Sequence, residues 1–220
     1  MMFSVFPRSA TRRSFLVGAA SLLASLPFAA HAQSKDISKE AGPFIQSLGE
    51  RAIALLSDKS VAVETRNKEF RKLFDESFDV SAIGRFTLGR YWRGLDEAKR
   101  REFLSLFGDM IVATYSARFT DYSGETFKVS GTRHEGDNHA LVSVQIDRPG
   151  ASAVRVDWRV LKSEQDNKLR IVDLVVEGIS LSVTQQQEFT SVIQRGGGEI
   201  DSLLTVLRQR IASPTAPAKS

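Results

Sequence analysis

The spacing of apolar residues changes near the middle of the chain, and this change restricts the fold more than any other feature of the sequence. Between residues 44 and about 122, apolar side chains recur every three to four positions, as on one face of an α-helix. From Phe127 to Val160 they mostly alternate with polar residues, and residues 169–176 are typical of a strand covered on both faces. Helical spacing returns after residue 181. This order of helices, strands and helices predicts a single α+β domain.

Turn and capping residues divide the helical regions into separate elements. The first helix is expected after Gly42-Pro43, and the second over about 62–77. Asp79 and Asp96 are plausible N-caps, the first for a short third helix and the second for a long helix that reaches about Tyr122. The two closing helices are expected over about 182–195 and 199–211.

About four strands are predicted between these helical regions, and they would form an antiparallel, twisted meander. Turn signals at Gly136, at Pro149-Gly150 and over residues 165–167 separate the strands. A twisted sheet of this size exposes an apolar face, and helices that cover it loosely would leave a pocket. On the third strand, Val154, Val156, Trp158 and Val160 are expected on one face, and Arg155, Asp157 and Arg159 on the other.

Residues 1–32 have the features of a cleaved export signal. Paired arginines precede an apolar run over residues 15–26, and the sequence Ala30-His31-Ala32 then predicts cleavage before Gln33. The apolar run is too short to span about 30 Å of hydrocarbon. The paired arginines are also typical of twin-arginine signals, so both the general and the twin-arginine export routes stay open. We therefore predict a periplasmic protein after removal of the signal.

Composition and charge exclude several classes of protein. The chain has no cysteine, which excludes disulfides, thiolate metal sites and a cysteine nucleophile. Its net charge is +4, but the three arginines of residues 1–32, where there is no acid, supply three of these charges. The nearly neutral remainder is not expected to bind nucleic acid. We predict one domain over residues 33–212 and a disordered tail over residues 213–220.

Catalytic and metal-binding motifs are not found. The sequence lacks the spacings of a zinc protease, a phosphate-binding loop and a nucleophile elbow. His134 and His139 flank a predicted turn without a metal-ligand spacing, so no metal site is predicted. We also predict no cofactor and no enzymatic activity. An enzyme would need an acid or base inside the fold. Asp157 alternates with apolar residues and is therefore not expected to point inward, whereas Asp173 stays a candidate.

Several motifs resemble the MlaC family, also called the toluene-tolerance family of periplasmic phospholipid-binding proteins. The most specific are residues 88–93 (Leu-Gly-Arg-Tyr-Trp-Arg) and residues 177–181 (Glu-Gly-Ile-Ser-Leu). Further matching stretches follow in the family's order, and the resemblance covers about residues 40–211. The chain departs from common family residues at three positions that bear on pocket shape and partner contacts: Trp158, Leu169 and Gln186.

The resemblance implies a nuclear-transport-factor-like sheet whose concave face and covering helices enclose lipid tails. It also implies a carrier that shuttles phospholipid across the periplasm and so maintains the lipid asymmetry of the outer membrane. Two partners are implied: an inner-membrane ABC transporter with lipid-binding domains, and an outer-membrane lipoprotein–porin complex. A hopanoid-associated member of the same family, which would carry a different apolar lipid, stays open as an alternative.

Twelve apolar side chains are expected to line the lipid cavity, from three parts of the chain. The long helix would contribute Phe103, Phe107, Ile111 and Tyr115, and the sheet Val154, Val156, Trp158 and Val160. One end would be closed by Phe86, Leu88, Tyr91 and Trp92, although residues 90–93 could instead form a structural corner. Two other functions stay open. The protein could be an adaptor with a filled core and no cavity, or it could be an enzyme that acts on a small molecule.

Overall fold

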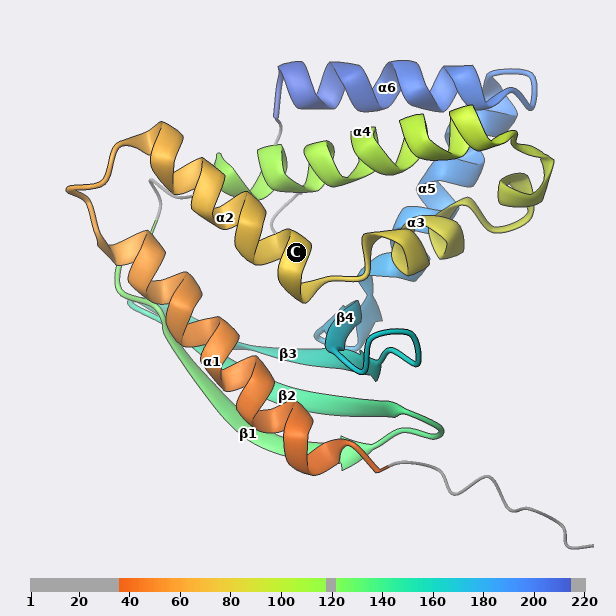
Figure 1. Ribbon diagram of the computed structural model, residues 1–220. Helices are drawn as coiled ribbons and strands as arrows, with labels where there is room; N and C mark the ends of the chain where they lie inside the picture. Colours follow the sequence, from red (N-terminus) through yellow and green to blue (C-terminus); the bar gives the residue numbers. More distant parts are fainter. Residues whose placement is uncertain (1–35, 118–121, 215–220) are drawn as a thin grey trace, which may run out of the picture. The chain divides into compact units, whose positions relative to one another are not determined.

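The structure is a computed structural model that describes residues 36–117 and 122–214 (Figure 1). The predicted export signal lies outside these residues, as do residues 215–220 of the predicted tail. The elements follow the order α1 (Ser38–Ser57), α2 (Val63–Ser77), α3 (Val80–Leu88), a 3₁₀ helix η1 (Gly89–Gly94), α4 (Glu97–Ser116), β1 (Thr126–His134), β2 (His139–Arg148), β3 (Ala151–Lys162), β4 (Leu169–Val176), β5 (Ile179–Ser180), α5 (Leu181–Arg195) and α6 (Ile200–Ala212). The α+β class with an antiparallel sheet is confirmed.

The two predicted N-caps are confirmed. The side chain of Asp79 accepts a hydrogen bond from the backbone N–H of Ala82 at 2.8 Å, and Asp96 accepts one from Lys99 at 2.8 Å. α4 is shorter than predicted and ends at Ser116. Tyr122 already belongs to the turn before β1, where its hydroxyl donates to the Glu125 carbonyl at 3.3 Å.

The first helix begins earlier than predicted, at Ser38, and includes Pro43. Proline ordinarily interrupts a helix beyond its first turn because it lacks an N–H donor. Here the residues before it are anchored by burial, since Ile37 is only 1% exposed and Ala41 is fully buried. Both belong to the apolar core between α1 and the sheet. This tertiary packing explains why the helix extends through the proline.

The sheet is an antiparallel meander with the strand order β1-β2-β3-β4-β5. The fifth strand, which the sequence did not predict, has only two residues and pairs with the end of β4. Glu177 and Gly178 form the turn between them, both at positive φ (47° and 85°) as a tight type I′ hairpin requires. The short strand brings the chain back toward the sheet immediately before α5 begins.

Two apolar cores hold the fold together. In the first, α1 packs on the sheet, with Ile45, Val142 and Val160 fully buried (Figure 1). The second lies among α3, α4, α5 and α6, where the Phe103 and Phe107 rings stack at 5.6 Å and the Phe189 ring meets both edge-on. α2 contacts both α1 and α4 and so connects the two cores. In the described part of the chain, no helix combines the length and apolar character needed to cross a membrane.

Candidate functional site

A cavity of about 740 Å³ lies between the two apolar cores. Its size is within the range of about 300–1,000 Å³ that is typical of ligand-binding pockets. Every helix from α1 to α6 contributes to its wall, together with β3 and β4. The apolar side chains of the wall are Leu48, Ala52, Phe70, Leu73, Phe74, Phe78, Ile83, Phe107, Met110, Ile111, Tyr115, Trp158, Leu174 and Leu181.

Two helices present a regular apolar stripe to the cavity. On α2 the stripe consists of Phe70, Leu73 and Phe74, which are three and four positions apart and therefore share one helix face. On α4 the same spacing brings Phe107, Met110, Ile111, Thr114 and Tyr115 to the wall. Tyr115, near the end of α4, is 37% exposed.

Four of the twelve predicted residues line the cavity: Phe107, Ile111, Tyr115 and Trp158. Phe103 lies one turn before Phe107 on the same stripe, but it is fully buried against Phe189. Leu88 is also buried, in the second core among α3, α4, α5 and α6, and Tyr91 and Trp92 of η1 pack against that core. Residues 90–93 lie in η1 and do not line the cavity. Phe86 is 47% exposed and does not line it either.

The predicted valines of β3 also lie outside the cavity wall. Val160 is fully buried in the core between α1 and the sheet, Val156 is 6% exposed, and Val154 is half-buried. Because α1 covers much of the sheet face, the sheet reaches the cavity only through Trp158, Asp173 and Leu174.

The α2 stripe and the neighbouring Phe78 are among the wall residues that were not predicted from the sequence. The Phe74 and Phe78 rings stack at 4.7 Å, and the Phe78 ring lies 6.4 Å from the Trp158 ring, so aromatic side chains connect α2 to the sheet across the wall. The helical spacing of Phe70, Leu73 and Phe74 was visible in the sequence. It predicts a buried face, but it does not distinguish a core from a cavity.

Trp158 also brings an unusual polar group to this wall. Its indole N–H is buried and has no hydrogen-bond partner within the described residues. The ring lies between Phe78 and Phe127, 6.0 Å from the latter, and neither phenyl ring offers a conventional acceptor. A buried donor without a partner costs about 1–3 kcal/mol.

The polar part of the wall includes an ion pair between α5 and α6. Arg210 donates from Nη2 to Oε1 of Glu188, and Gln185 donates to Oε2 of Glu188 at 3.0 Å. The hydrogen bond from Arg210 lowers the pKa of Glu188 against the opposing effect of partial burial. Glu188 is therefore ionised at neutral pH. Both side chains are partly exposed, by 41% for Glu188 and 36% for Arg210.

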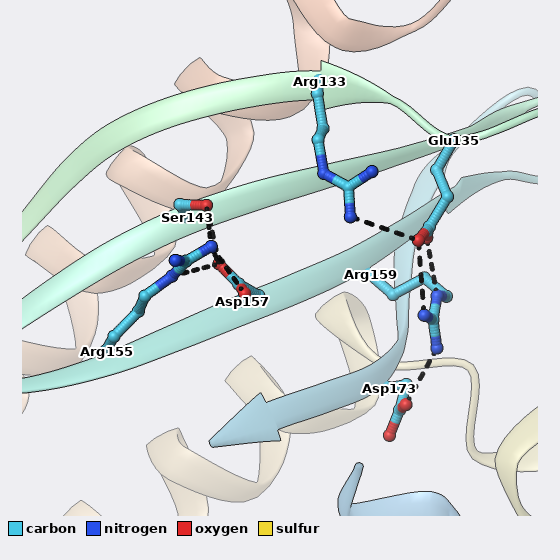
Figure 2. Close-up of polar contacts among 7 residues, drawn as sticks. All are labelled: Arg133, Glu135, Ser143, Arg155, Asp157, Arg159 and Asp173. Carbon is cyan, nitrogen blue, oxygen red and sulfur yellow. Dashed lines mark hydrogen bonds and ion pairs between the residues drawn. The ribbon is translucent and has the colours of Figure 1, made fainter. Parts of the chain in front are cut away.

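Asp173 borders the cavity, but its carboxylate is held by three hydrogen bonds. Oδ2 accepts from Arg159 at 2.9 Å (Figure 2). It also accepts from the Ser180 hydroxyl at 2.7 Å, and Oδ1 accepts from the Ser182 backbone N–H at 3.0 Å. Arg159 also donates to Glu135 at 2.7 Å, which lowers the pKa of Glu135. These contacts make Asp173 an anchor between the sheet and the start of α5.

Asp157, the other acid considered in the enzyme reading, is not part of the cavity wall. Figure 2 shows it beside Arg155 and Ser143, and it accepts hydrogen bonds from them at 3.0 Å and 2.6 Å. The carboxylates of Asp157 and Asp173 thus both accept hydrogen bonds from neighbouring protein groups. His134 and His139 do not line the cavity. In residues 36–117 and 122–214, no group of three or more His, Asp or Glu side chains could hold a metal ion.

Comparisons with known proteins agree with the fold. The family model described as MlaC protein matches residues 46–209. The intermembrane phospholipid transport system binding protein MlaC of Haemophilus influenzae is 23% identical over 138 residues, which is 62% of this chain and 64% of that protein. The match thus spans just under two thirds of the relative's length.

A solved structure shows the same fold. The phospholipid-binding protein from Ralstonia solanacearum, in complex with a phospholipid, superposes with a TM-score of 0.68 at 21% sequence identity. The alignment covers 78% of this chain and 97% of that one. The resemblance seen in the sequence is thereby confirmed, and because the family model covers most of the chain, this protein belongs to the MlaC family.

Proposed function

We propose that this protein is a periplasmic carrier that encloses the acyl chains of a phospholipid in the cavity between its sheet and its helices. The apolar cavity of about 740 Å³ is the observation that carries this proposal. The phospholipid in the related Ralstonia solanacearum structure and the transport role in the name of the Haemophilus influenzae relative support it.

The energetics of lipid transfer explain why such a cavity is needed. Exposing a methylene group to water costs roughly 0.8 kcal/mol, so two tails of about fifteen methylenes each would cost on the order of 20 kcal/mol without shelter. The wall offers aromatic and aliphatic side chains in place of water. A carrier of this kind needs few polar contacts, since the headgroup can stay near the surface.

The tails would contact the apolar wall rather than all twelve residues expected from the sequence. Phe107, Ile111, Tyr115 and Trp158 belong to both sets, and the α2 stripe joins them. The cargo would be exchanged with an inner-membrane ABC transporter that has lipid-binding domains and with an outer-membrane lipoprotein–porin complex. This exchange would maintain outer-membrane lipid asymmetry. Residues 1–32 would direct export to the periplasm and be removed near Ala32.

Mass spectrometry of organic extracts tests the proposal directly. The mature protein would be purified from the periplasm without detergent, and bound lipid would be quantified against protein. Phospholipid at a stoichiometric ratio is the expected result. Hopanoid in its place would assign the protein to the hopanoid-associated variant of the family. Lipid-free protein that also fails to take up lipid from vesicles would overturn the carrier function.

A further inference from the structure

The cavity wall is mostly apolar, and α5 and α6 contribute a charge pair to it. Among the described residues of the wall, Glu188 and Arg210 are the acid and base that bind each other. The third charged wall residue, Asp173, is paired instead with Arg159, which is not part of the wall. The cavity therefore has one place where both signs of charge face the same space.

Helix packing places this pair beside α4, at the level of Phe107. Lys99 pairs with Asp201, and Glu102 pairs with Arg208, so α6 runs in the same direction as α4. The Phe189 ring, next to Glu188 in sequence, meets the Phe107 ring of α4 at 5.9 Å. Since both charged side chains are also partly exposed, the pair lies where the apolar wall meets solvent.

Each member of the pair has hydrogen-bonding capacity left for a ligand. In the described part of the chain, Arg210 uses only Nη2, so its other N–H groups are available. A guanidinium group is well suited to bind phosphate oxygens. Glu188 is ionised and has lone pairs beyond those that accept from Arg210 and Gln185. A carboxylate in this state can accept hydrogen bonds from an ammonium group.

We propose that Arg210 and Glu188 form a headgroup site for a zwitterionic phospholipid, with the phosphate on Arg210 and the primary amine of an ethanolamine headgroup on Glu188. This inference rests on the proposed carrier function. Arg195 also lowers the pKa of Glu188 through its charge, but it is not part of the described wall. The pair that lines the cavity has no net charge, so a zwitterion leaves this part of the wall balanced. An anionic headgroup would instead place an uncompensated negative charge beside Glu188, which is unfavourable in a partly dehydrated site.

Competition between two headgroups with the same tails tests this site. Delipidated protein would be incubated with vesicles of equimolar phosphatidylethanolamine and phosphatidylglycerol, and the bound lipids would be quantified by mass spectrometry. We expect the wild-type protein to enrich phosphatidylethanolamine about threefold, since partly exposed charge contacts change binding by no more than about fivefold. Glu188→Gln should shift the ratio toward phosphatidylglycerol, whereas Arg210→Gln should lower retention of both lipids without that shift.

The matched controls come from another ion pair, which connects α6 to α4. Glu102 and Arg208 connect α4 to α6 but do not line the cavity, so Glu102→Gln and Arg208→Gln should leave the lipid ratio unchanged. Glu188→Asp keeps the negative charge and should keep the preference. The same ratio in the wild-type protein, Glu188→Gln and the vesicles would overturn the headgroup site while leaving the carrier intact. Absence of any bound lipid in the wild-type protein would instead overturn the carrier function.

Discussion

Arg159 on β3 lies directly opposite Asp173 on β4, and its Nη1 donates to Oδ2 of Asp173 at 2.9 Å. The strand register shifts immediately after Arg159, so the next pair along is Val160 with Ile171. The carboxylate of Asp173 is only 5% exposed and also binds Ser180 and Ser182 at the start of α5. One buried acid thus holds two strands and a helix that together form part of the cavity wall.

Replacement of Asp173 by Asn should therefore destabilise the fold. The variant loses charge-assisted hydrogen bonds and leaves Arg159 without its buried partner, so we expect a loss of about 2 kcal/mol in the free energy of unfolding. Urea denaturation followed by circular dichroism measures this change. As a control, Glu76→Gln removes an exposed ion pair with Arg51 and should leave the unfolding midpoint unchanged. Equal midpoints for Asp173→Asn and the wild type would refute the anchor role.

The pH dependence of stability should reveal the Glu135–Arg159 ion pair. The hydrogen bond from Arg159 lowers the pKa of Glu135 below its ordinary value of 4.5. A carboxylate with a lowered folded-state pKa contributes stability that is complete above the unfolded-state value and is lost as pH falls through the folded-state value. Stability should therefore decrease below about pH 4.5. Urea denaturation of Glu135→Gln between pH 3 and pH 7 should show a smaller acid-induced loss than the wild type, whereas parallel curves would contradict this assignment.

The local parts of this structure could be predicted from the sequence, and the boundary between core and cavity could not. Asp79 and Asp96 cap their helices through groups three residues away, so short sequence patterns were enough. Phe103 and Phe107 belong to one helical stripe, yet Phe103 is enclosed by Phe189 from a distant helix and only Phe107 reaches the cavity. This difference depends on tertiary packing. The spacing of apolar residues in the sequence is the same for a core position and for a cavity position.

The extension of α1 and the charge pair of the wall were missed for the same reason. Pro43 indicates a helix start when only local propensity is considered, and burial of Ile37 and Ala41 overrides it. Glu188 and Arg210 are 22 positions apart on separate helices, so their contact depends on how α5 packs on α6. Distances of this kind are set by the assembled fold.

Filling the cavity should reduce lipid binding without unfolding the protein. Ile111 lies on the wall and is only partly buried, so Ile111→Trp can place its larger ring in the space that an acyl chain would occupy. We expect about tenfold weaker lipid binding, which corresponds to about 1.4 kcal/mol. The measurement is lipid transfer from vesicles to delipidated protein. Val112→Trp is the matched control, because Val112 is the next residue on α4 and does not line the cavity. If both variants bind lipid equally well, the cavity is not the lipid site.

Replacement of Trp158 by Phe tests whether its indole N–H, which is buried and has no partner within the described residues, contacts a bound lipid. Because this donor has no partner within the described residues, Trp158→Phe removes no internal hydrogen bond that the structure shows and relieves a buried polar group. If the ring turns so that an ester carbonyl of the lipid accepts from this N–H, the variant should bind lipid about fivefold more weakly, equivalent to about 1 kcal/mol. The unfolding free energy of the delipidated protein should change little, because relief of the buried polar group offsets the packing lost with the smaller ring. Lipid-transfer assays and urea denaturation provide the two measurements.

The second tryptophan supplies the comparison for this variant. Trp92 packs against the second core, among α3, α4, α5 and α6, and does not line the cavity, so Trp92→Phe should leave lipid affinity at the wild-type value. Weaker binding in Trp158→Phe alone would identify the indole N–H as a ligand contact, because the substitution keeps an aromatic ring between Phe78 and Phe127. Unchanged affinity in both variants would mean that the bound lipid places no acceptor at this donor, and that the apolar wall alone holds its tails.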